Sequence, residues 1–277
     1  MSMISASAPN GDGVLDWFAE WRWREPMLTA FAILMAVAML PTLLAILIDA
    51  RTFNGINVWI KPLKFEASLA IFFATLGWFW GYLDAEVRAR KSVRVALLLI
   101  CGSGFFEVAY IAFRAALAEA SHFNNSTRLT EALYGLMGVG ILIQVSLAAW
   151  AGVLILRSRE SGISPTLRFS IGMGLVAGTV LGGVTGAFMS AQTGHWVGGV
   201  ANDATGMFFF GWSRTGGDLR VAHFVGLHAM QGIPIIGYLV RNVPAGRTVV
   251  WASLVIWTAA TIFFFIQALQ GRPLLTL

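Results

Sequence analysis

Five polar side chains that could bind a ligand or move a proton fall within one short apolar segment. They are a carboxylate, a guanidinium, two imidazoles and a carboxamide, at Asp218, Arg220, His223, His228 and Gln231. The residues between them are apolar enough to begin a membrane-spanning helix, where polar groups are costly. Each of these groups therefore needs a structural partner or a function.

The histidines limit the metal chemistry that the chain could support. His223 and His228 are five residues apart, about 140° around a helix, so a straight helix cannot direct both at one ion. The chain has four histidines in all, too few for a di-iron site built from histidine clusters. One haem fits this number, as does one zinc or copper ion with three nitrogen ligands. The candidate metal ligands are His122, His195, His223 and His228. The single cysteine, Cys101, excludes an internal disulfide and a cysteine-based metal site.

A second polar stripe lies on another apolar segment. Ser103, Glu107, Tyr110 and Arg114 are spaced by four, three and four residues, which places them on one side of a helix. With Lys64 and Glu66 on the preceding segment, we expect one intramembrane site opening toward the outer surface. Its expected ligand-binding residues are Lys64, Glu66, Glu107, Tyr110, Arg114, His223, His228 and Gln231. The alternative is a packing seam in which these groups only neutralise one another.

The composition identifies the environment of these residues. The chain has 277 residues, of which 57% are hydrophobic and 12% charged, whereas soluble domains have about 25% charged residues. The surface must therefore face lipid. The net charge of +5 comes from residues between apolar segments, where membrane topology explains it, so no nucleic-acid partner is expected.

Seven apolar segments are long enough to cross a bilayer. They are residues 27–49, 62–83, 94–117, 131–156, 167–191, 219–240 and 248–269. This pattern predicts an all-α integral membrane bundle of seven transmembrane helices over residues 27–277. Residues 1–26 are expected to form a tail, without the features of a secretory signal, and an interfacial amphipathic helix. In the fifth segment Gly174, Gly178 and Gly182 recur every four residues, a spacing that favours close helix packing and could support an oligomer.

The Lys and Arg residues predict the orientation. Of the 19 in the chain, one set of segment ends carries 11 and the other carries eight. The larger set is Arg22, Arg24, Arg88, Arg90, Lys91, Arg94, Arg157, Arg159, Arg168, Arg241 and Arg247. The positive-inside rule places this set, and the N-terminus, in the cytoplasm and the C-terminus outside.

The predicted outer connection from Gln192 to Asp218 is long, and loops of this length are usually functional or disordered. It contains the apolar run Met207–Trp212, which is poorly suited to water. We expect this loop to dip into the membrane or to fold over the bundle as a lid.

Three segments resemble those of uncharacterised bacterial polytopic membrane proteins. They are Trp59–Phe65, the SHFNxST motif from Ser121 to Thr127, and the GGDLRxAHFxGLHAxQ motif from Gly216 to Gln231. The resemblance implies a multi-pass protein of the bacterial cytoplasmic membrane and brings no activity with it. Seven helices with an inner N-terminus are also similar to membrane zinc hydrolases of the ceramidase and progestin-receptor type. Those carry a His-x-x-x-His pair on the last span, where this chain has no histidine.

These features favour a membrane-embedded protein that binds a lipophilic small molecule from the outer side, with a redox role if that molecule is a cofactor. Haem b or a quinone is expected ahead of zinc or copper, and a lipid-like molecule fits equally. The alternatives are a metal-dependent, hydrolase-like membrane enzyme and a transporter of small molecules or ions.

Overall fold

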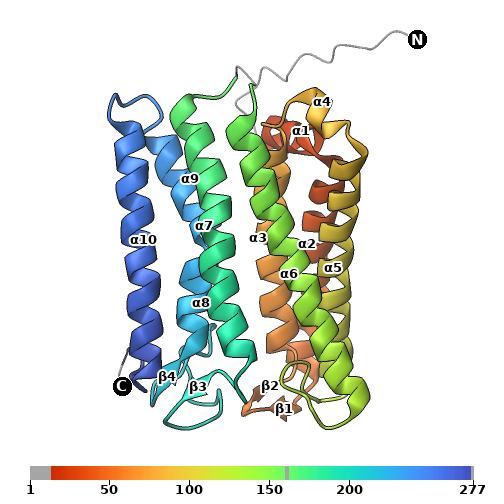
Figure 1. Cartoon of the computed structure of the whole chain (residues 1–277). Coiled ribbons are helices and arrows are strands. Elements are labelled where there is room, and N and C mark those ends of the chain that lie inside the picture. The colour runs from red at the N-terminus through yellow and green to blue at the C-terminus, as the bar shows by residue number, and fades with distance from the viewer. Residues whose placement is uncertain (1–13, 160–161, 276–277) are drawn as a thin grey trace, which may run out of the picture.

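The computed structural model describes residues 14–159 and 162–275, so the predicted tail before residue 14 lies outside the described part of the chain. The long helices run side by side (Figure 1). The helices are α1 (Val14–Arg24), α2 (Pro26–Ile48), α3 (Ile60–Trp80), α4 (Ala85–Arg88), α5 (Lys91–Ala116), α6 (Arg128–Arg157), α7 (Pro165–Ser190), α8 (Leu219–Leu227), α9 (Ala229–Leu239) and α10 (Gly246–Leu269).

Each of the seven predicted segments forms a helix or, in the sixth, a consecutive pair of helices. Within the described residues, five helices are long and apolar enough to cross a membrane: α2, α5, α6, α7 and α10. They expose large apolar side chains to the surroundings, such as Leu47 on α2 at 82% exposed and Val255 on α10 at 66%. Such a surface suits lipid, and we conclude that the chain is an all-α, multi-pass membrane protein.

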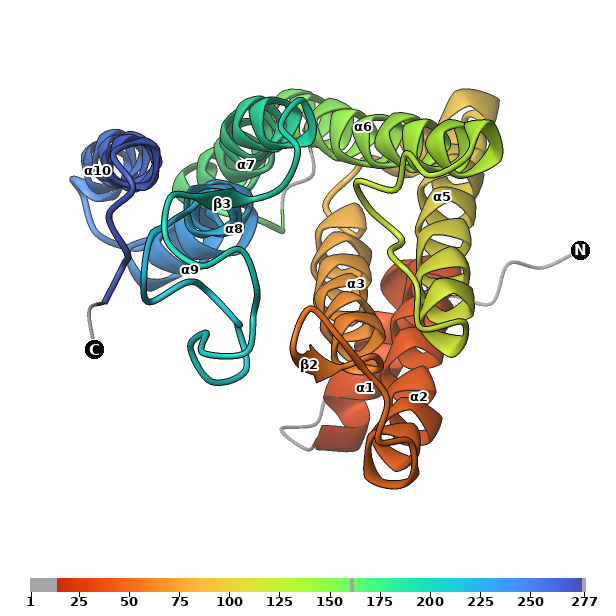
Figure 2. The same ribbon diagram turned by 90° about the horizontal axis from the view of Figure 1, so that it is seen from below.

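The helices form two groups (Figure 2). One contains α1, α2, α3, α5 and α6, and the other contains α7, α8, α9 and α10. The groups join where α6 packs along α7, with Gly152 and Gly172 at the closest approach. A side chain at Gly152 would come within 2.8 Å of the Gly172 carbonyl oxygen, so small residues are what let these two helices meet.

Local sequence signals fix where several helices begin. Thr127 caps α6 by accepting from the Thr130 backbone N–H, and the Thr130 hydroxyl accepts from the Thr127 backbone in return. Ser164 caps α7 and is followed by Pro165 at its first turn. Asp218 caps α8 by accepting from the backbone N–H of Arg220.

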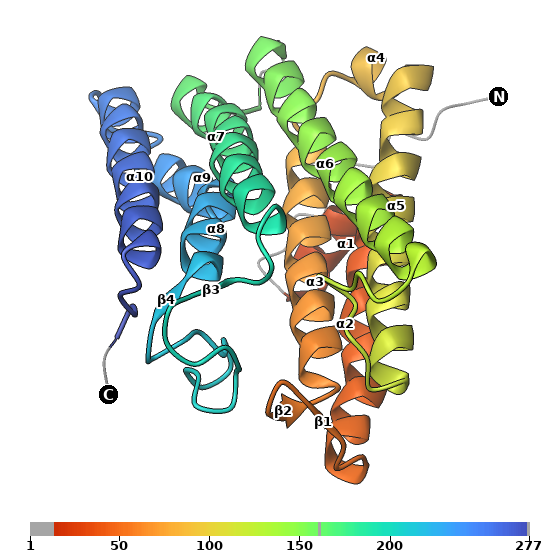
Figure 3. The ribbon, with the colours of Figure 1, turned by 60° about the horizontal axis from the view of Figure 1, so that its bottom comes forward.

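Two small antiparallel hairpins lie at one end of the bundle (Figure 3), which we call the hairpin end. In the first, β1 (Thr52–Phe53) pairs with β2 (Ile56–Asn57), in the register Thr52↔Asn57 and Phe53↔Ile56. Asn54 and Gly55 both have positive φ, as the tight turn of a two-residue hairpin requires. In the second, β3 (Trp196–Val197) pairs with β4 (Gly217–Asp218), and Trp196 lies opposite Asp218. This second hairpin closes the long predicted loop into a compact cap.

The sixth predicted span is broken at His228, between α8 and α9. The Val225 carbonyl, which would accept from Ala229 in an unbroken helix, instead accepts from the indole of Trp257 on α10 at 2.7 Å. Pro234 lies inside α9 and has no N–H to bond the Met230 carbonyl. The break lies at His228, six residues before Pro234, and α9 continues through the proline.

The glycine stripe on α7 faces this broken pair. A side chain at Gly174 would come within 2.7 Å of Pro234 Cδ, and one at Gly178 within 2.9 Å of the Leu227 carbonyl oxygen. These glycines therefore serve helix packing within the chain, as the four-residue spacing indicates. Association between copies through the other side of α7 stays a prediction.

The opposite end of the bundle carries α1 and α4 (Figure 1), and we call it the α4 end. Trp21 of α1 donates its indole N–H to the Ala74 carbonyl on α3 at 3.2 Å. Arg24 lies over the rings of Trp78 and Tyr82 and donates to the Trp78 carbonyl. Helix α1 is therefore anchored to the end of α3.

Candidate functional site

A cluster of charged side chains lies where the long loop covers the hairpin end. It contains Lys61 and Lys64 from the start of α3, His195 and Asp203 from the loop, Asp218 from β4, and Arg220 from α8. We call these six residues the hairpin-end cluster. It spans both helix groups, because α3 belongs to one and α8 to the other.

Arg220 forms ion pairs with both carboxylates of the hairpin-end cluster. Its guanidinium lies 2.6 Å from an Asp218 carboxylate oxygen and 2.8 Å from an Asp203 oxygen. It also donates to the Gly211 carbonyl at 2.6 Å. Asp218 is 2% exposed and Asp203 is 9% exposed, so both carboxylates depend on this single cation. This arginine therefore links the loop to α8 through both carboxylates.

The two lysines are not neutralised in this way. Lys64 Nζ donates to the Phe210 carbonyl at 2.9 Å, and Lys61 lies within electrostatic range of Glu107, Asp203, Arg220 and Lys64. Among the described residues, neither lysine has a carboxylate within salt-bridge distance. Both are half-buried. Neither ammonium group is therefore in direct contact with a described carboxylate, although Asp203 lies within electrostatic range of both.

Two histidines lie in the same region, His195 in the long loop and His122 in the α5–α6 loop. His195 Nε2 lies 3.6 Å from Asp203, beyond hydrogen-bond distance. Burial lowers the pKa of His195 below its ordinary value, although Asp203 opposes this effect. Burial also lowers the pKa of His122, which lies between the rings of Phe65 and Tyr134. Burial alone would raise the pKa of Asp203, but His195 and Arg220 outweigh it and lower the value.

A series of aromatic rings leads from the loop into the helix break. Phe210 stacks on Trp212 at 4.4 Å between ring centres, and both rings contact Phe224 on α8. Phe224 in turn stacks on His228 at 3.9 Å. The apolar run thus folds over the bundle as expected for its inner residues. Phe208, at the tip of this run, does not fold over the bundle, because its side chain is 97% exposed.

The structure joins only some of the residues that the sequence assigns to one site. Glu107 is buried and within electrostatic range of Lys61. Tyr110 is buried against Phe106, and its hydroxyl makes no hydrogen bond to a described residue. Arg114 instead forms an ion pair with Glu119 at 2.5 Å and donates to the Ala120 carbonyl, holding the α5–α6 loop.

The remaining four predicted residues each contact a different neighbouring element. Glu66 points toward α2 and accepts from the Thr42 hydroxyl at 2.8 Å. Gln231 connects the two helix groups by donating to Thr75 on α3 at 3.3 Å. His223 contacts the Gly182 carbonyl on α7 through Nδ1, and His228 contacts the Phe224 carbonyl of its own helix through Nδ1. No hydrogen bond joins Glu107 to His228 among the described residues.

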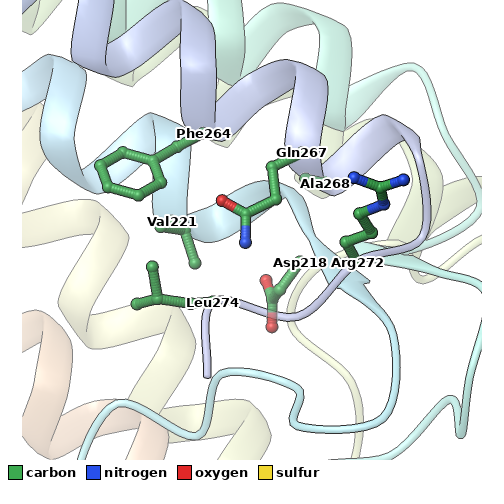
Figure 4. Close-up of a pocket in the computed structure, with 7 residues that line it drawn as sticks. All are labelled: Asp218, Val221, Phe264, Gln267, Ala268, Arg272 and Leu274. Carbon is green, nitrogen blue, oxygen red and sulfur yellow. The ribbon is translucent and has the colours of Figure 1, made fainter. Parts of the chain in front are cut away.

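The described residues include no group of three His, Cys, Asp or Glu side chains placed to hold a metal ion. A small cavity lies beside β4, between α8 and α10 (Figure 4), and the side chains of Asp218 and Gln267 point into it. Its volume is about 10 Å³, which suits one water molecule. This cavity is too small for a haem, a quinone or a lipid-like molecule.

Lys61, Asp203, Asp218 and Arg220 are the residues that the sequence-based site omits. A signal for the lysines is present, since Lys61 and Lys64 are three residues apart and share a helix face. Asp218 and Arg220 flank the start of α8 and carry opposite charges. Asp203 has no such signal, because only the folded loop brings it to Arg220.

Comparisons with known proteins leave the chain without an assigned relative. No family model matches it, and no curated protein or solved structure is significantly similar. The resemblance to bacterial membrane proteins stays a prediction, and the function has to be argued from the site.

Proposed function

We propose that the protein binds a lipophilic molecule with an anionic headgroup, which is held at the hairpin-end cluster by Lys61 and Lys64. The observation that carries this proposal is the pair of half-buried ammonium groups that have no described carboxylate within 4 Å. Arg220 already occupies both nearby aspartates. An entering phosphate or carboxylate would therefore bind the lysines without displacing an internal ion pair.

The apolar part of the ligand would lie against the aromatic series. The rings of Phe210, Trp212 and Phe224 contact one another beside Lys64, which donates to the Phe210 carbonyl. Charged groups that fix orientation beside apolar walls are typical of small-molecule sites. Exposed Phe208, at the loop tip, would contact the outer leaflet and help a membrane-dissolved ligand to enter.

The proposed setting is a seven-span bundle in a bacterial inner membrane, with the α4 end cytoplasmic and the hairpin end outside. Its support is the excess of Arg and Lys at the α4 end. A reporter fused after Leu277 should be extracytoplasmic, and one between Arg88 and Arg94 cytoplasmic. The opposite result at both positions would overturn this orientation.

The binding test is a titration of the purified protein in dodecyl maltoside micelles with dodecyl phosphate, followed by tryptophan fluorescence. Trp212 lies in the aromatic series and should report binding. Lys61→Gln/Lys64→Gln removes two charge-assisted contacts and should weaken binding about 100-fold. Lys91→Gln, which removes the third lysine of the chain at the α4 end, is the matched control and should bind as the wild type does.

A saturable response that the double variant keeps unchanged would contradict the proposal. A response of equal size to an uncharged dodecyl ether would do the same, since the lysines would then have no role. Far-ultraviolet circular dichroism of the double variant establishes that its helices remain folded.

Haem is the second candidate, and one observation favours it. His223 and His228 each have Nδ1 within hydrogen-bond distance of a backbone carbonyl. Donation from Nδ1–H would leave Nε2 as the metal ligand, the arrangement common in metal sites. Hemin added to the protein should then give a Soret band that His228→Ala or His223→Ala abolishes. An unchanged band in both variants would rule out these ligands.

A further inference from the structure

A basic groove at the α4 end is separate from the hairpin-end cluster. It lies where the turn between α1 and α2 meets α4 and the first turn of α5, and has a volume of about 310 Å³. Its lining residues are Trp23, Arg24, Glu25, Pro26, Ala85, Arg88, Ala89 and Arg94. Three guanidinium groups thus face one carboxylate.

The charges of this groove are only partly satisfied within the chain. Arg24 is paired with Glu20 at 2.7 Å and lies over Trp78 and Tyr82, so its position is fixed. Glu25 accepts from the Met27 backbone N–H, which caps α2, and interacts with Arg88 only at longer range. Among the described residues, Arg88 and Arg94 have no carboxylate within 4 Å.

Arg88 also has a buried donor with no acceptor. Its Nε is shielded from solvent and makes no hydrogen bond to a described residue. A buried donor left unpaired costs free energy, whereas a phosphate oxygen in the groove would satisfy it. Arg94 is exposed at the groove's edge, where its fork of N–H donors can reach a second oxygen of the same group.

The groove also has the surroundings expected at a membrane surface. Trp23 at its rim is 66% exposed, and tryptophan favours the headgroup region of a bilayer. Helix α1 is fixed against α3 by the Trp21 and Arg24 contacts, so the groove exists before a ligand arrives. Basic pockets between membrane helices at the cytoplasmic face suit anionic lipid headgroups.

We infer that this groove binds the phosphate headgroup of an anionic glycerophospholipid, with Arg88 and Arg94 as its main ligands and Trp23 beside the glycerol region. The site is independent of the proposed outer ligand. It gives the bundle a fixed lipid at the end where α1, α2, α4 and α5 meet, and would stabilise the packing of the short helix α4.

Native mass spectrometry of the detergent-purified protein, mixed with phosphatidylglycerol, tests the inference. The wild type should retain phosphatidylglycerol, and Arg88→Gln/Arg94→Gln should weaken that binding roughly 30-fold. The matched control is Arg90→Gln/Lys91→Gln, which removes the same charge at the same end from exposed residues outside the groove. It should retain the lipid.

Arg88→Lys/Arg94→Lys keeps the charge and should restore part of the binding, which distinguishes a lost site from a misfolded protein. Lys61→Gln/Lys64→Gln should leave it unchanged, which separates this site from the outer one. Equal retention of phosphatidylcholine with the same acyl chains, or normal phosphatidylglycerol retention by Arg88→Gln/Arg94→Gln, would overturn the inference.

Discussion

The two ends of the bundle both concentrate positive charge, but they differ in what covers it. At the hairpin end the long loop supplies Asp203 and Asp218, and Arg220 is fully paired with them. At the α4 end Arg88 and Arg94 line a groove to which no long loop among the described residues contributes. The difference indicates that a covered cluster can select a particular ligand, whereas an open groove suits an abundant membrane lipid.

The largest effect is expected from replacing Arg220, which pairs with both aspartates at the hairpin end. Arg220→Met leaves Asp203 and Asp218 buried without their cation, which should cost about 3 kcal/mol of loop stability. Hydrogen exchange in residues 195–220 should therefore accelerate about 100-fold. Exposed Arg128, at the start of α6 on the same end, provides the control variant Arg128→Met. Unchanged exchange in Arg220→Met would show that the loop is held by other contacts.

Acidification is expected to affect the hairpin end more than the α4 end. Burial lowers the pKa of His195 in the folded long loop, so the unfolded loop binds a proton more readily. Burial lowers the pKa of His122, in the neighbouring α5–α6 loop, in the same way. The stability of the loop should be constant above about pH 6.5 and decrease as the pH falls below it. Hydrogen exchange of the loop, corrected at each pH for the exchange rate of unstructured peptides, tests this pH dependence. His195→Asn should reduce the pH dependence, with the remainder due to His122, and a loop that tightens in acid would contradict the assignment.

The sequence predicts the helical framework closely because its signals are local. The predicted segment 167–191 and the observed helix Pro165–Ser190 differ by one or two residues, since Ser164 and Pro165 mark the start of the helix. The glycine stripe at Gly174 and Gly178 similarly indicates a close contact. Hydropathy patterns and helix caps depend on residues that are close together in the chain, so both can be recognised directly in the sequence.

The site is predicted less well because it depends on contacts between distant residues. Asp203 meets Arg220 only after β3 and β4 pair. Glu66 and Lys64 are two residues apart on α3, yet one faces Thr42 and the other the long loop. Arg114 finds its partner in Glu119, outside its own stripe. Helix periodicity identifies a shared face, but not which neighbouring helix or loop that face meets.

The most direct test of the proposed function uses the three lysines of the chain, Lys61, Lys64 and Lys91. Protein labelled with ¹⁵N at the lysine ammonium groups gives one solid-state NMR signal for each. Phosphorus from bound dodecyl phosphate should dephase the Lys61 and Lys64 signals and leave Lys91 unaffected. Equal dephasing of all three, or of none at saturating dodecyl phosphate, would contradict an anionic headgroup site at the hairpin end.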